Sequence, residues 1–291
     1  MRRVVAVAAC VLALIGCTSG RSTSGDRAAT RTPSPTPRST STPTPTPRPG
    51  SCHADVSEYR IAFVVDPGVP AAVAAEVKTE SRVARRAYPV DTPVCGVGRV
   101  RTLISDRARG QATANTASRG HGRFTIRVWT GGAAWRDAPA DLRLLILLHE
   151  WYHVVQFSFL DCSRGNDACR SAGRVPLWLL EGSAQYEAER IGGAMGIGGG
   201  YAARRAIEIR EATLVRSPLS HLGRIAGAEY ALAFAAVEFL VARAGEASLL
   251  RFWRSAAKTG AWRVSFLRAF GSSVVRFESA FERYRARGFR S

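Results

Sequence analysis

The sequence contains almost no lysine, although it is strongly basic: Lys78 and Lys258 are the only lysines among 41 basic residues. The formal net charge is +18, of which residues 1–50 carry +6, so residues 51–291 keep +12. Such a charge would suit an anionic partner, for example a membrane surface, a wall polymer or an acidic protein. The arginine bias, with abundant alanine and glycine, is also typical of a GC-rich genome, and we favour that interpretation of the composition.

The N-terminal apolar run is too short to span a membrane. Arg2 and Arg3 precede the run Val4 to Ile15, a pattern typical of a secretory signal peptide. The run ends in Leu-Ile-Gly-Cys, which resembles the lipobox of bacterial lipoproteins and predicts a lipid on Cys17. An ordinary signal peptide cut a few residues later is the alternative. The chain is therefore expected to be lipid-anchored to the bacterial cell membrane on its extracytoplasmic side, where nucleic acid is not a partner.

Apolar side chains are almost absent from residues 18–50, which consist mainly of Ser, Thr, Pro, Arg and Gly. Such a segment cannot form a core, and its repeated prolines predict an extended, polyproline-like tether. At roughly 3 Å per residue the tether could reach on the order of 100 Å from its anchor. We therefore divide the chain into a signal peptide (1–16), a lipidated and disordered tether (17–51) and one folded domain (52–291).

No C-x-x-C pair occurs, which argues against a metal bound by cysteines. Beyond the signal peptide and Cys17, the chain has four cysteines: Cys52, Cys95, Cys162 and Cys169. Four cysteines in an exported domain indicate two disulfides, and three pairings are open. A bond from Cys162 to Cys169 would close a small loop, and one from Cys52 to Cys95 would tie the start of the domain to its first layers.

The pattern of apolar residues predicts an α+β fold. Alternation predicts strands over 59–66, 98–106 and 122–130. The polar stretch 107–121 is expected to be a loop. Helical spacing predicts helices over 71–87, 139–160, 176–191, 200–214, 228–244, 246–258 and 272–288. A small N-terminal sheet layer is thus followed by a mostly helical C-terminal half.

Two histidines and a glutamate interrupt the apolar stretch LLILLHEWYHVVQF, residues 144–157. His149 and His153 are four residues apart, so on a helix they lie on nearly the same face, one turn apart. This H-E-x-x-H spacing is typical of two zinc-binding imidazoles, with Glu150 acting on the water that the metal activates. Two core histidines beside an incidental glutamate are the alternative, but Glu150 would then be an unpaired charge in an apolar helix.

A catalytic zinc needs a third protein ligand, and the stretch VPLWLLEGSAQYE, residues 175–187, offers Glu181. Glu181 lies 28 residues after His153, far enough for the chain to leave one helix and return on a second. In isolation a surface glutamate near a helix start would be the simpler interpretation. Following H-E-x-x-H, a metal ligand is favoured.

HEWYHVVQ followed by PLWLLEGSAQYE resembles the gluzincin zinc metallopeptidases, the clan of thermolysin and the aminopeptidase-N-like enzymes. The resemblance covers about residues 122–285 in layout, and identity rests on these two short motifs. It implies that His149, His153 and Glu181 bind Zn²⁺ and that Glu150 is the general base. It also implies a side chain that stabilises the oxyanion, either Tyr230, which opens a predicted helix, or His221, in a predicted loop.

Two departures from that clan bear on activity. No G-x-M-x-N segment precedes the histidine helix, so no anchor for a free substrate amine is visible, and an endopeptidase is favoured over an aminopeptidase. Gln185 stands four residues after Glu181 in place of an acid, so the groups behind one histidine must differ.

The expected function is zinc-assisted hydrolysis of a bond in a peptide or protein. Strand 122–130 could present its edge to the extended substrate, with Gly131 and Gly132 leaving room for it. Hydrolysis of a non-peptide amide in the cell wall would use the same zinc site. The alternative function is a non-catalytic, peptidase-like surface lipoprotein that binds anionic wall polymers or partner proteins through its basic surface.

Overall fold

The computed structural model describes residues 53–94, 96–110, 112–160 and 175–290. The expected signal peptide and the tether with Cys17 lie outside the described residues, as do Cys52, Cys95, Cys162 and Cys169. The lipid anchor and the disulfides therefore stay predictions. Of the helices in the described part of the chain, none is long and apolar enough to cross a membrane.

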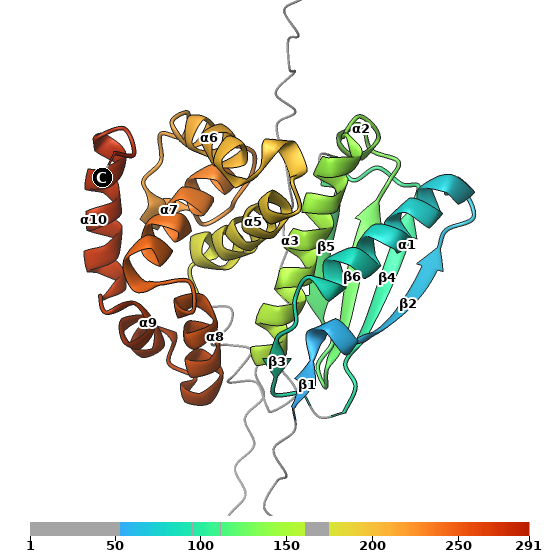
Figure 1. Cartoon of the computed structure of the whole chain (residues 1–291), viewed down its shortest axis with the longest axis horizontal. Helices are drawn as coiled ribbons and strands as arrows, with labels where there is room; N and C mark the ends of the chain where they lie inside the picture. Colours follow the sequence, from blue (N-terminus) through green and yellow to red (C-terminus); the bar gives the residue numbers. More distant parts are fainter. Residues whose placement is uncertain (1–52, 95, 111, 161–174, 291) are drawn as a thin grey trace, which may run out of the picture.

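The described residues form a sheet layer followed by a mostly helical half, which confirms the predicted α+β class. Helix α3 (Ala140–Phe159) lies between the two parts, with the strands on one side of it and the later helices on the other (Figure 1). α3 is almost wholly buried from Leu145 to Phe159. The predicted active-site helix is thus the central element of the fold.

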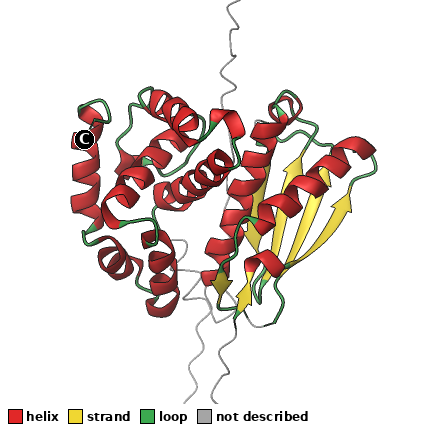
Figure 2. Ribbon diagram, viewed as in Figure 1, coloured by secondary structure: helices red, strands yellow, loops and turns green. Residues whose placement is uncertain are grey.

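The main sheet has four strands in the order β2-β4-β6-β5. Its parallel strands are β2 (Arg60–Val65), β4 (Arg99–Ser105) and β6 (Arg123–Trp129), and β5 (Ala114–Ser118) is antiparallel to β6. A separate two-stranded ribbon joins β1 (Ala54–Asp55) to β3 (Asp91–Thr92). Helices α1 (Ala71–Arg86) and α3 lie on one face of the sheet (Figure 2), and alternate strand residues are buried beneath them.

The prediction of a loop over residues 107–121 is wrong at its centre, where residues 114–118 form strand β5. The sequence ANTAS has no large apolar side chains to alternate, and it becomes a strand because it pairs with β6. β6 is consequently paired on both sides, so the hypothesis that strand 122–130 offers a free edge is also wrong. Gly131 allows a close backbone approach, but the backbone that approaches is that of Asp106 and not that of a substrate. A Cβ at Gly131 would lie 1.5 Å from the carbonyl oxygen of Asp106.

The helical half contains α5 (Leu177–Ala194), α6 (Tyr201–Ala212), α7 (Glu229–Ala244), α8 (Ser248–Thr259), α9 (Trp262–Phe270) and α10 (Val274–Ala286). The seven predicted helices are present within three residues at each end, whereas α9 and the short α2 (Ala133–Arg136) were not predicted. In α9, Trp262, Phe266 and Phe270 recur every four residues and are buried. This spacing is typical of a helix face packed on a core.

Helices α5 and α7 approach each other closely at Gly182. A Cβ at this position would lie 2.4 Å from the carbonyl oxygen of Ala233 and 3.0 Å from a methyl carbon of Val237. The facing part of α7 is rich in buried alanine, which permits this approach. Because Gly182 directly follows Glu181, the same contact fixes the depth at which Glu181 sits.

Replacing Gly182 with alanine is expected to destabilise the protein. Alanine is the better helix former by about 1 kcal/mol, but the added methyl group would push against backbone atoms of α7. We expect Gly182→Ala to lower the free energy of unfolding by about 1–3 kcal/mol, measured by urea denaturation in the presence of a chelator. Gly223→Ala is the control, because a Cβ at Gly223 meets nothing within 4 Å. Equal stability of the two variants would contradict this account of the α5–α7 contact.

Candidate metal centre

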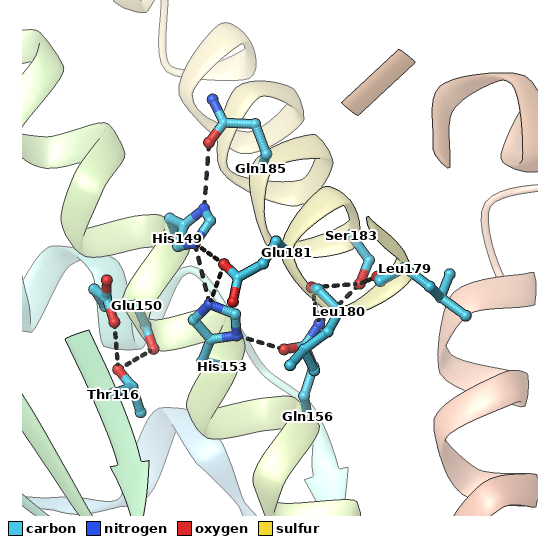
Figure 3. A network of polar contacts seen from close by, with 10 residues as sticks. All are labelled: Thr116, His149, Glu150, His153, Gln156, Leu179, Leu180, Glu181, Ser183 and Gln185. Carbon is cyan, nitrogen blue, oxygen red and sulfur yellow. Dashed lines mark hydrogen bonds and ion pairs between the residues drawn. The ribbon is translucent and has the colours of Figure 1, made fainter. Parts of the chain in front are cut away.

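Two neighbouring helices bring the three predicted ligands together. Pro139 is the N-cap of α3, which starts the helix so that His149 and His153 lie one turn apart on the side facing α5. Glu181 lies in the second turn of α5 and points between the two imidazole rings (Figure 3). Their side-chain donor atoms all lie within 4.8 Å of one another.

The spacing of these donor atoms suits a small metal ion. His149 Nε2 lies 3.0 Å from His153 Nε2, and Glu181 Oε2 lies 3.3 Å and 3.2 Å from these two nitrogens. A tetrahedral zinc ion with bonds of about 2.0–2.1 Å keeps its ligand atoms roughly 3.3–3.4 Å apart. All three residues are at most 4 % exposed. The three residues therefore fit zinc in number, type and separation.

Two glutamines fix the orientation of the two imidazoles. The Gln156 amide nitrogen donates to Leu180 O (2.9 Å) and Ser183 Oγ (2.8 Å), so its oxygen faces His153 Nδ1 at 2.6 Å. An amide oxygen only accepts, so Nδ1 of His153 must carry a proton. In the neutral ring Nε2 then holds a lone pair, and that lone pair points at the other two donors.

The same argument holds for His149. The Gln185 amide nitrogen donates to Glu189 Oε1 (3.1 Å) and Glu208 Oε1 (3.2 Å), so its oxygen faces His149 Nδ1 at 3.2 Å. Both imidazoles therefore present Nε2 toward Glu181. The lone pairs of His149 Nε2, His153 Nε2 and Glu181 Oε2 point at one place and repel each other unless a cation lies between them. A bound metal ion would be such a cation.

A buried charged network lies behind Gln185. Arg204 of α6 donates two hydrogen bonds to Glu189, with Nε to Oε2 at 2.7 Å and Nη2 to Oε1 at 2.6 Å. Burial and the neighbouring Glu189 carboxylate raise the pKa of Glu208 to about 8. Gln185 thus stands where the gluzincin pattern has an acid. Its amide nitrogen donates to two carboxylates, those of Glu189 and Glu208.

The electrostatics of the three donors show the same need for a positive charge. Burial lowers the pKa of His153, but the carboxylates of Glu181 and Glu150 outweigh it and raise this pKa to about 9. Burial would raise the pKa of Glu181, yet His153 and His149 hold it well below its usual range. In the absence of a metal, a proton on His153 supplies the positive charge between these groups.

Glu150 is fully buried and lies on the sheet side of α3 (Figure 3). The hydroxyl of Thr116 in strand β5 donates to Glu150 Oε2 at 2.7 Å and to the Glu150 carbonyl oxygen at 3.0 Å. Oε1 has no hydrogen-bond partner within the described residues. Burial raises the pKa of Glu150, while both histidines and Thr116 oppose this shift. A carboxylate with one oxygen fixed and the other available suits the handling of a proton.

The structure separates the two candidates for oxyanion stabilisation. Tyr230 opens α7 as predicted, is 2 % exposed, and its ring lies edge-on to that of His149 with centroids 5.9 Å apart. His221 ends a 3-10 turn (Leu219–His221) and is exposed. Within the described chain, His221 makes no ring contact or hydrogen bond with the three donors. The geometry therefore favours Tyr230.

The sequence interpretation did not identify several residues that support the site. Thr116 lies in the stretch expected to be a loop, and Ser183, Glu189 and Glu208 give no local signal. Gln156 was detectable in principle, because it follows His153 by three residues and so shares its helix face.

Comparisons of the chain with protein-family models, curated proteins and solved structures find no match. The site itself therefore carries the evidence for a function.

We expect purified protein to contain about one zinc ion per chain, measured by elemental mass spectrometry. Glu181→Ala should lose most of this zinc, because it removes the one carboxylate donor of the cluster. Glu211→Ala is the control, since Glu211 lies on α6 and, among the described residues, its carboxylate pairs only with Arg210. Absence of zinc after reconstitution of the native chain, or full zinc content in Glu181→Ala, would contradict the site.

Proposed function

We propose that the protein is an extracytoplasmic, membrane-anchored zinc peptidase of the gluzincin type. The observation that carries this proposal is the convergence of His149, His153 and Glu181 beside the buried carboxylate of Glu150. A zinc ion held by the three donors would acidify a water molecule and polarise a substrate carbonyl. The motif resemblance, the α+β class and the central position of α3 support the same function.

Glu150 would serve as general base and then as general acid. Its raised pKa brings the carboxylate closer to the working pH, at which it can accept a proton from the attacking water and give it to the leaving amine. Thr116 would hold Oε2 so that Oε1 faces the reacting atoms. Thr116 is thus a positioning residue that links the base to the sheet.

Strand β5 supports a peptide as the substrate. β5 is one of the two edge strands of the four-stranded sheet, and an extended peptide can add to such an edge through backbone hydrogen bonds. Thr116 lies at the middle of β5 and contacts Glu150, so a peptide bound along β5 would run past the base. Pairing along an edge strand engages several residues of a substrate, which is compatible with an endopeptidase.

Replacing Glu150 with glutamine should keep the zinc and remove the activity. Glutamine has nearly the same shape but cannot take up a proton, and general acid–base catalysis contributes about 10²–10⁴-fold to rate. We expect kcat on a fluorogenic peptide library to fall by at least about 10²-fold, while the zinc content stays at the wild-type level. A zinc-bound wild type that cleaves no peptide would favour the non-catalytic lipoprotein, and a fully active variant would remove Glu150 from the mechanism.

Tyr230→Phe tests the oxyanion assignment, because it keeps the ring against His149 and removes only the hydroxyl. Loss of one oxyanion donor costs about 10²–10³-fold in kcat, so a loss of this size with little change in KM is expected. His221→Ala serves as the comparison and should stay within about twofold of the wild type. The opposite pattern would assign the role to His221.

A further inference from the structure

The face of the sheet opposite α1 and α3 is rich in arginine. In β2 the residues that point away from the helices, Arg60, Ala62 and Val64, are exposed. Within the described residues, this open face carries Arg60, Arg99, Arg101, Arg119, Arg123 and Arg127. We call this set the arginine face.

The strand register places three of these arginines in one row. Arg60 is opposite Arg99, and Arg99 is opposite Arg123, on three adjacent parallel strands. Neighbouring strands are about 4.8 Å apart, so three guanidinium groups leave the sheet side by side. Like charges at directly opposed positions are destabilising. The row of Arg60, Arg99 and Arg123 is therefore expected to lower the folding stability of the sheet.

The arginine face has no carboxylate partners in the part of the chain that the structure describes. The salt bridges among the described residues involve other arginines, for example Arg143 with Glu76 and Arg204 with Glu189. Burial, together with the charges of Arg119 and Arg109, lowers the pKa of Arg127. The strand register gathers these arginines on one surface, which a general arginine bias does not by itself explain.

A hollow of about 870 Å³ lies among these side chains. Arg60, Arg99, Arg101, Arg119 and Arg123 line it, and all five are exposed. No acidic residue is among its described lining residues. Guanidinium groups bind phosphate through paired hydrogen bonds, and a recess surrounded by five of them can enclose several phosphates at once.

We propose that the arginine face binds a linear anionic polymer that carries phosphate groups along a flexible chain. A flexible polymer chain can enter the hollow and contact the arginine row and the guanidinium of Arg101 beside it. A bilayer is a broad flat surface and cannot enter a hollow in this way. Membrane-binding faces also place large apolar side chains among basic ones. On the arginine face Val64 is 37 % exposed, and Leu103 and Trp129 are more buried. The site lies on the side of the sheet away from α3, so it is separate from the proposed catalytic site.

The test measures binding of medium-chain inorganic polyphosphate to the full chain by isothermal titration calorimetry over a range of salt concentrations. The variant is the triple substitution Arg60→Gln, Arg99→Gln and Arg123→Gln. The control triple is Arg268→Gln, Arg276→Gln and Arg283→Gln, which removes the same charge from exposed positions on α9 and α10. We expect the sheet triple to weaken binding at least tenfold and to reduce the slope of log K against log salt by about 2–3. The control should change binding less than threefold.

Equal weakening by the two triples, or no binding of polyphosphate to the wild type, would overturn the proposal. Binding of phosphatidylglycerol vesicles that requires the arginine row, without binding of polyphosphate, would overturn it in favour of a membrane surface. Zinc content should be unchanged in both triples, so this result is independent of the peptidase proposal. If the sheet triple does not fold, Arg101→Gln with Arg119→Gln tests the same hollow, and at least a threefold loss of binding is expected.

Discussion

Three lone pairs directed at one point between α3 and α5 are the constraint on which the rest of the structure depends. His149 and His153 are held in this arrangement by Gln185 and Gln156, whose amide nitrogens are themselves hydrogen-bonded on the far side. A buried cluster of this kind is costly unless a cation joins it. The protein maintains it at the centre of the fold, where any loosening of the helices would disturb the core.

The cluster also joins the two halves of the molecule. α3 packs on the sheet and supplies both histidines, whereas α5 belongs to the helical half and supplies Glu181. Thr116 ties Glu150 to strand β5. Gln185 ties His149 to α6, directly through Glu208 and through Glu189 to Arg204. The sheet, the central helix and α6 therefore all contribute to the position of this cluster.

The sequence was sufficient to predict the fold class, the main helices and the three convergent donors, because apolar periodicity and a short motif encode them locally. It was insufficient for β5, whose residues Ala-Asn-Thr-Ala-Ser become a strand only through pairing with β6. Thr116 was missed for the same reason. The contact of Gln185 with Glu208 depends on how α6 packs on α5, and no spacing along the chain reports that packing.

The near-complete burial of the donors has a consequence for how a metal would exchange. With His149, His153 and Glu181 at most 4 % exposed, neither a chelator nor a peptide could reach an ion between them until the surrounding helices part. The rates of metal loss and of substrate entry would then both depend on the frequency of that opening. Gly182, which lets α5 and α7 approach within backbone contact beside Glu181, would help to make the opening rare. Metal exchange and substrate access would thus be coupled.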